Sequence, residues 1–125
     1  MMVCDNIKGL SSLGHDIELH FHPQWLYSTI SNNGWEMDLD HYKLSDIPKE
    51  EVFDLFTWSK YVLDNLIEYN TVAFRAGGYS LNSFEQYPLL LKSNNIRIDS
   101  SVIARKCVHS RFQSYDYREV PLKDY

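Results

Sequence analysis

The sequence has few of the features that mark several large protein classes. Only two of its 125 residues are cysteines, Cys4 and Cys107, and no CxxC spacing occurs. This scarcity argues against a disulfide framework and against a zinc ribbon. The longest apolar runs are only about three or four residues, so we expect no membrane-spanning helix. The first residues lack a basic start followed by an apolar core, which argues against a secretory signal and favours a cytoplasmic location.

Basic charge is also scarce. Lys and Arg number 12 against 17 Asp and Glu, so the formal net charge is −5. This balance gives no general attraction to nucleic-acid phosphates or anionic membranes, and the small cluster of Arg105, Lys106 and Arg111 does not change that prediction. Hydrophobic residues make up 44% of the chain and aromatic residues 14%, as in an ordinary globular domain. We interpret residues 1–125 as one domain.

Local patterns predict an α/β chain whose strands are mostly parallel. The clearest helix is expected from Pro48 to Asn70, capped by Ser45 or Asp46, because its apolar residues form one stripe over almost five turns. Residues 24–47 are interpreted as a long loop, with a turn at 32–34. The remaining expected helices cover about 5–13 and 82–92, the expected strands cover 16–22, 71–75 and 96–99, and the tail after 102 is expected to be irregular. Alternating helices and strands favour a parallel sheet.

Each predicted strand ends in polar, reactive side chains. These are His20 and His22, then Arg75, then Asp99. The carboxyl ends of parallel strands meet at one edge of a sheet, so we expect these side chains to converge. His20 and His22 are two residues apart and therefore project from the same face of a strand. Such a pair can share a divalent metal ion, most commonly zinc, although a polar layer without an ion explains the pair equally well.

The other candidate residues have plainer interpretations beside the functional ones. The Arg75 guanidinium follows an apolar run and needs either a structural ion pair or an anionic substrate group. Asp99 can bind a metal ion, orient a histidine or, most simply, cap the following turn. The pair Gly77-Gly78 permits a sharp turn or a close approach of the backbone. Trp25 and Tyr79 can stack against a sugar or pack in the core.

Three blocks of the sequence resemble the polysaccharide deacetylase superfamily, the NodB-homology group. The segment GHDIELHFHPQW, residues 14–25, is similar to the metal motif of a branch that reads GHEIxLHxHPxW. FRAGGY, residues 74–79, matches that branch's version of the family's R-x-P-Y groove motif, and NIRIDSSV, residues 95–102, resembles its later G-I-x-x-D-S-S-V strand. The blocks also follow one another in the family's order, so the resemblance covers residues 14–102.

The resemblance implies a distorted (β/α) barrel that removes acetyl groups from sugars or polysaccharide precursors, for example in cell-envelope polysaccharide biosynthesis. In that chemistry a divalent metal ion polarises the acetyl carbonyl and activates a water molecule, while an Asp acts as base and a His as acid. By position His20 matches the first metal histidine. The family's second histidine falls at Gln24, so His22 is the expected substitute.

The same resemblance assigns roles to the remaining residues. Arg75 matches the arginine that supports the catalytic base, and Asp99 matches a carboxylate that faces the active site. Tyr79 matches the aromatic residue of the substrate groove, which we expect Trp25, Gly77 and Gly78 to complete.

The chain also departs from the family pattern. The family's first motif, with its Asp pair, and its last motif, with the acid histidine, have no counterpart in residues 1–125. We therefore expect a partial barrel whose open sheet is covered by further chain segments or by a second subunit, and which is marginally stable alone. A non-catalytic carbohydrate-binding module, or a degenerate fragment of such a domain, is the alternative function. An unrelated α/β protein in which the two histidines are accidental is the third interpretation.

Overall fold

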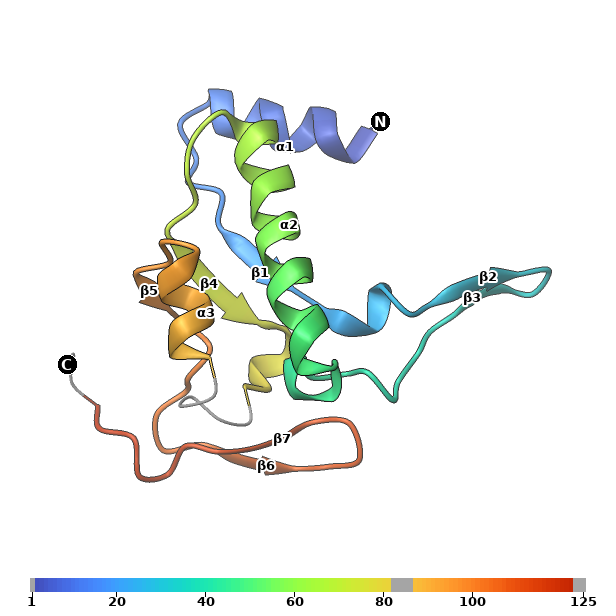
Figure 1. The fold of residues 1–125 in the computed structure, drawn as a ribbon, viewed down its shortest axis with the longest axis vertical. Coiled ribbons are helices and arrows are strands. Elements are labelled where there is room, and N and C mark those ends of the chain that lie inside the picture. The colour runs from blue at the N-terminus through green and yellow to red at the C-terminus, as the bar shows by residue number, and fades with distance from the viewer. Residues whose placement is uncertain (1, 82–86, 123–125) are drawn as a thin grey trace.

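The computed structural model describes residues 2–81 and 87–122, in which helices alternate with short strands (Figure 1). The helices are α1 (Met2–Ser12), α2 (Lys49–Ile67) and α3 (Pro88–Ser93), with single 3-10 turns at η1 (Pro23–Trp25), η2 (Leu44–Asp46) and η3 (Gly77–Tyr79). The strands are β1 (Leu19–Phe21), β2 (Thr29–Ser31), β3 (Gly34–Glu36), β4 (Ala73–Ala76), β5 (Ile98–Asp99), β6 (Cys107–His109) and β7 (Ser114–Asp116).

A three-stranded parallel sheet in the order β1-β4-β5 forms the centre of the molecule. Its register aligns His20 with Arg75 and, on the next pair of strands, Phe74 with Asp99. The predicted α/β class with a parallel sheet is therefore confirmed. Among the described residues the sheet does not close into a barrel.

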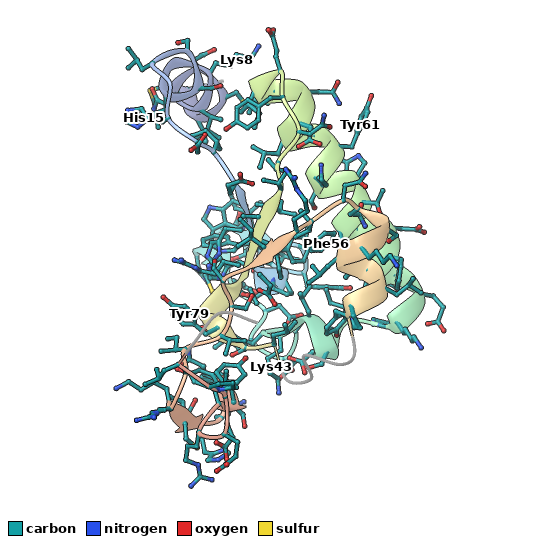
Figure 2. The ribbon with its side chains drawn as sticks, turned by 90° about the vertical axis from the view of Figure 1, so that its left-hand side faces the viewer. Lys8, His15, Lys43, Phe56, Tyr61 and Tyr79 are labelled. Atoms are coloured by element: carbon teal, nitrogen blue, oxygen red, sulfur yellow. The ribbon has the colours of Figure 1, made fainter. Side chains whose placement is uncertain are left out.

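The two faces of this sheet differ sharply. Helices α2 and α3 lie together on one side of the strands (Figure 2), where Phe56 of α2 meets Phe74 of β4 with ring centroids 5.0 Å apart. Side chains of β1 and β4 that point to this side are buried, as are the helix residues above them. The opposite side presents His20, Arg75 and Ile98, all of them exposed. The core thus lies between one sheet face and two helices.

Two antiparallel hairpins were not expected from the sequence. β2 pairs with β3 and projects away from the rest of the chain (Figure 1), where a long loop was expected. β6 pairs with β7 where an irregular tail was expected. Both predictions were wrong because strands of three residues carry too few alternating positions to stand out. Cross-strand pairing holds both hairpins, and contacts with distant segments add to it at β6–β7.

The predicted helix boundaries were also partly wrong. Asp46 does not cap α2, because its carboxylate accepts the backbone N–H of Lys43 within η2 (2.8 Å). Pro48 precedes the first turn instead, and α2 ends at Ile67, followed by Glu68 in the left-handed conformation. α3 begins at Pro88, while residues 82–86 of the helix expected over 82–92 lie outside the described residues. No helix in the described ranges has the length and apolar character needed to cross a bilayer.

Candidate functional site

The two histidines of the first strand meet through their ring nitrogens. His20 lies on β1 and His22 directly follows it in extended conformation, so both rings project to the same side. Nε2 of His20 is 2.8 Å from Nε2 of His22, and the rings pack edge to face with centroids 4.5 Å apart. Burial and the neighbouring His20 lower the pKa of His22. The predicted pairing of these histidines is therefore present in the structure.

Neighbouring groups determine which nitrogens carry protons. Nδ1 of His20 is 2.9 Å from the carbonyl oxygen of Arg75, which can only accept, so Nδ1–H donates and Nε2 of neutral His20 has a lone pair. Nε2–H of His22 then donates to it, and Nδ1 of His22 accepts a hydrogen bond from the side-chain amide nitrogen of Gln24, 3.1 Å away. This chain of hydrogen bonds is satisfied without an ion.

A second arrangement of the same side chains would accept a cation. If the Gln24 amide is turned over, its oxygen can accept Nδ1–H of His22, and the lone pair of His22 then lies on Nε2. Two Nε2 lone pairs would then face each other, an arrangement that a metal ion bound to both nitrogens would stabilise. Gln24 is almost fully buried, and among the described residues its Oε1 has no hydrogen-bond partner. The observed 2.8 Å spacing is that of the metal-free hydrogen bond. A shared zinc ion would need the two rings to separate slightly, because tetrahedral zinc holds two nitrogen ligands about 3.3 Å apart.

Gly77 provides the space in which the His22 ring lies. A Cβ at this position would be 2.6 Å from Nδ1 of His22 and 2.7 Å from the carbonyl oxygen of Phe21. The turn η3 therefore packs directly against the histidine pair. Gly78 adopts φ +60°, and a Cβ there would lie 3.0 Å from both Tyr42 Oη and Gln113 Nε2. The Gly-Gly pair thus serves both close approach and a left-handed backbone.

Arg75 lies beside the histidines on the exposed face of the sheet. Its register partner is His20, its Nε donates to Ser100 Oγ (3.1 Å), and its guanidinium lies 5.7 Å from the ring centroid of Tyr79. The ion pairs found within the described residues do not include Arg75. The structural ion pair that would explain this arginine most simply is thus not seen within the described residues.

Asp99 lies on the other face of the sheet from this group, and the Trp25 ring packs against Trp35. Asp99 aligns with Phe74, so the strand alternation places it on the helix-covered side, opposite to Arg75. Its Oδ1 accepts the backbone N–H of Ser101 (2.8 Å), the turn-capping role that was the plainer interpretation, while its buried Oδ2 has no partner within the described residues. Trp25 is exposed and packs edge to face against Trp35, with centroids 6.3 Å apart.

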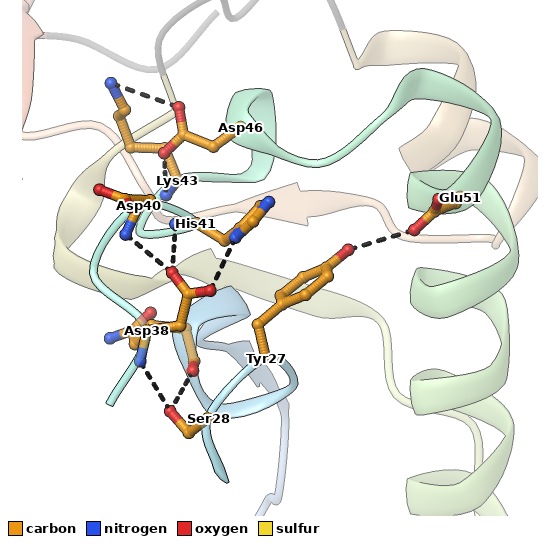
Figure 3. A network of polar contacts seen from close by, with 9 residues as sticks. Tyr27, Ser28, Asp38, Asp40, His41, Lys43, Asp46 and Glu51 are labelled. Carbon is orange, nitrogen blue, oxygen red and sulfur yellow. Dashed lines mark hydrogen bonds and ion pairs between the residues drawn. The ribbon is translucent and has the colours of Figure 1, made fainter. Parts of the chain in front are cut away.

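A polar network orders the loop that carries Gln24 (Figure 3). Ser28 Oγ donates to the carbonyl oxygen of Gln24 (2.5 Å) and accepts the backbone N–H of Asp38 (3.1 Å). The Asp38 carboxylate is 3.0 Å from Nδ1 of His41, whose ring stacks on Tyr27 at 4.0 Å. The hydrogen bond from His41 lowers the pKa of Asp38. The long loop is therefore held by side-chain contacts, which the sequence pattern did not reveal.

The metal-ligating residues of the described chain fall into two separate groups. Near His20 and His22 no third His, Cys, Asp or Glu completes a cluster within residues 2–81 and 87–122. A three-residue group that could hold a metal ion lies instead on the hairpin β6–β7, where ligand atoms of Cys107, His109 and Asp116 are all within 4.8 Å of one another. Sequence reasoning missed this group because Asp116 is joined to the other two only by the hairpin register. The alternation of Cys107 and His109 was its one local signal.

Comparisons with protein-family models, with curated proteins and with solved structures find no match to this chain. The geometry of the site is therefore the observation on which a function must rest.

Proposed function

We propose that this chain forms part of a metal-dependent carbohydrate deacetylase, with His20 and His22 as ligands of a divalent ion such as zinc. The observation that carries the proposal is the 2.8 Å approach of the two Nε2 atoms beside Arg75 at the carboxyl ends of parallel strands. Imidazole nitrogens are the commonest zinc ligands in catalytic sites. Parallel sheets gather their reactive groups at this edge.

The chemistry follows from the positions of the side chains. A bound divalent ion would polarise an acetyl carbonyl and lower the pKa of a bound water. The Arg75 carbonyl oxygen would hold the His20 ring through Nδ1–H, and Gln24 would hold His22 in the same way. The Arg75 guanidinium would bind a carboxylate or a developing oxyanion near the reaction centre. Tyr79, which lies against Arg75, would flank the sugar.

A partial (β/α) barrel is the architecture we propose for this domain. In such a barrel one sheet face is covered by helices and the other faces the interior, and here the helix-covered face is apolar while the other presents His20 and Arg75. A groove of about 1110 Å³ runs along β5, past Thr71, Arg97 and Ile98. This groove is where a further parallel strand or a second subunit would pair with β5.

A non-catalytic carbohydrate-binding module is the second candidate function. Two observations favour it. No third ligand or acidic base approaches the histidines within the described residues, and Trp25 and Trp35 present exposed aromatic rings that suit the apolar face of a sugar. In this case Trp25 and Trp35 would bind a sugar ring without hydrolysis.

Acetate release from an acetylated sugar polymer tests the first proposal directly. The purified chain is supplied with Zn²⁺ or Co²⁺ and compared with the double variant His20→Ala/His22→Ala and with His15→Ala, an exposed histidine outside the site. The proposal expects acetate release that is lost in the double variant and retained in His15→Ala. Release that is unchanged by the double variant, or no release at all, contradicts it.

Sugar binding separates the two candidates. The same polymer is titrated into the chain and into Trp25→Ala/Trp35→Ala under metal-free conditions. Binding that depends on the two tryptophans, without acetate release, supports the binding module. If the chain shows no acetate release and no tryptophan-dependent binding, both candidate functions are contradicted.

A further inference from the structure

The hairpin β6–β7 carries a group of potential metal ligands on one face. Its register pairs Cys107 with Asp116 and His109 with Ser114, so these four side chains project to the same side. The alternate positions hold Val108 and a buried Tyr115, which packs toward the body of the protein. Ligand atoms of Cys107, His109 and Asp116 lie within 4.8 Å of one another, close enough to bind a single ion.

Groups around this face already orient two of the three ligands. The Arg118 guanidinium donates to both carboxylate oxygens of Asp116, at 2.9 and 2.5 Å. A carboxylate has about four lone-pair positions, so Arg118 leaves room for an ion while it holds the group in place. Ser114 Oγ lies 3.2 Å from Nδ1 of His109 and restrains its ring. In known metal sites, hydrogen-bond partners of this kind orient the side chains that bind the ion.

The hairpin is also fixed to the rest of the molecule, which makes its ligand face a preformed one. Tyr117 Oη donates to the carbonyl oxygens of Tyr79 (2.8 Å) and Leu81 (3.0 Å). The Tyr115 and Tyr117 rings stack 4.8 Å apart, and the Gln113 amide donates to the carbonyl oxygen of Gly78. A rigid support reduces the ordering cost that an ion would otherwise have to offset.

We propose that this face is a zinc site in which Cys107 thiolate, one His109 ring nitrogen and one Asp116 oxygen bind the ion, with water in the fourth position. Thiolate and imidazole ligands select zinc-like transition ions over Mg²⁺ and Ca²⁺, which prefer oxygen. Binding forms the metal–sulfur bond and releases the thiol proton to solvent. Because Cys107 and Asp116 come from different strands, the ion would cross-link the hairpin, whose two strands alone are marginally stable.

Co²⁺ titration of the reduced full chain, followed by displacement with Zn²⁺, tests this site independently of the proposed deacetylase function. A cobalt–thiolate charge-transfer absorption is specific to a cysteine ligand, and the chain has a second free cysteine, Cys4, as a matched control. The variants are Cys107→Ser, His109→Gln and Cys4→Ser, together with His20→Ala/His22→Ala to remove the other histidine pair. Circular dichroism of each variant verifies that it is folded.

The expected result is one thiolate-type absorption that is lost in Cys107→Ser and retained in Cys4→Ser and in His20→Ala/His22→Ala. Affinity should fall at least about tenfold in His109→Gln, because loss of even an outer partner of a metal site typically costs 10–100-fold. Zn²⁺ should also raise the Tm of the wild-type chain but not that of Cys107→Ser. The proposal is overturned if the absorption is absent from the folded chain, if Cys107→Ser retains it, or if Cys4→Ser abolishes it.

Discussion

Gly77 lies so close to His22 that a Cβ on Gly77 would stand 2.6 Å from Nδ1 of the imidazole. The replacement Gly77→Ala should therefore displace the His22 ring or the η3 backbone, since the carbonyl oxygen of Phe21 prevents movement in the other direction. We expect a loss of about 1–3 kcal/mol in the free energy of unfolding, as for other overpacked sites, measured by urea denaturation. Gly9→Ala is the control, because a Cβ there meets nothing within 4 Å. A Gly77→Ala protein as stable as wild type, with unchanged His22 ring resonances, would refute this packing.

Glu18 joins the start of β4 to the segment before β1. Its Oε2 accepts the backbone N–H groups of Val72 and Ala73, both at 2.8 Å. Glu18→Ala would leave these two donors without that acceptor, so we predict a loss of about 1–3 kcal/mol in the free energy of unfolding. Glu36→Ala, at an exposed position of β3, should change it by less than about 0.5 kcal/mol. Equal effects of the two substitutions in the same urea experiment would contradict the proposed link.

Asp64 connects the end of α2 to Thr71, two residues before β4. It pairs with the largely buried Lys60 (2.5 Å) and accepts both the N–H and the hydroxyl of Thr71. Burial alone would raise the pKa of Asp64, but hydrogen bonds from Lys60 and Thr71 outweigh it and lower the pKa from 3.8. The stabilisation is thus complete above the pKa of the unfolded chain and is lost as pH falls through the lower folded value.

The replacement Asp64→Asn should remove this acid dependence and leave Lys60 without its partner. We expect the free energy of unfolding to fall by about 3 kcal/mol at neutral pH, as for other broken buried ion pairs. When unfolding is repeated at acid pH, the free energy of unfolding of the variant should decrease less than that of the wild type. Asp54→Asn, at an exposed position of the same helix, serves as control. If the stability of Asp64→Asn decreases with falling pH as steeply as that of the wild type, Asp64 is not the source of the acid dependence.

Tyr117 anchors the hairpin β6–β7 to the turn after β4. Burial raises the pKa of this phenol to about 12, so its neutral form is stabilised in the fold. This contribution is present below the ordinary value of 10 and is lost as pH rises through 12. Tyr117→Phe removes both hydrogen bonds and should lower the free energy of unfolding by about 1–2 kcal/mol. It should also remove one high-pH step from the spectrophotometric titration of the tyrosines. Tyr87, also raised to about 12, should still titrate late. Tyr61→Phe, at an exposed site, should leave both late steps intact.

The parallel sheet and the histidine pair could be predicted because their signals are local. Alternation over residues 16–22 places His20 and His22 on one side whatever the rest of the chain does. The stripe of apolar residues likewise predicted α2, in which Val52, Phe56 and Ile67 are buried, although Val62 of the same stripe is exposed. Lys60 is buried on the same helix, which no hydrophobic pattern predicts, because its burial depends on Asp64 and on the fold around it.

The remaining features depend on local turns and on contacts between distant segments. Gln24 contacts His22 only because the 3-10 turn η1 folds the chain back, and Gly77 is required only because η3 packs on that ring. Cys107 and Asp116 meet through a hairpin register, which is set by a turn that the sequence pattern did not reveal. The face on which Asp99 lies follows from its alignment with Phe74, and a strand of two residues gives no reliable alternation from which to predict it.

The pairing of β1 with β4 also constrains how the chain folds. His20 and Arg75, which the sheet places side by side, are 55 positions apart in the chain. Closing so long a segment has an entropic cost that precedes any gain from the sheet, whereas α2 forms from neighbours in sequence. We therefore expect α2 to form early and to shorten the effective distance between β1 and β4. The central strands would then assemble late, and their hydrogen-bonding edges would stay open to other chains for most of the folding time.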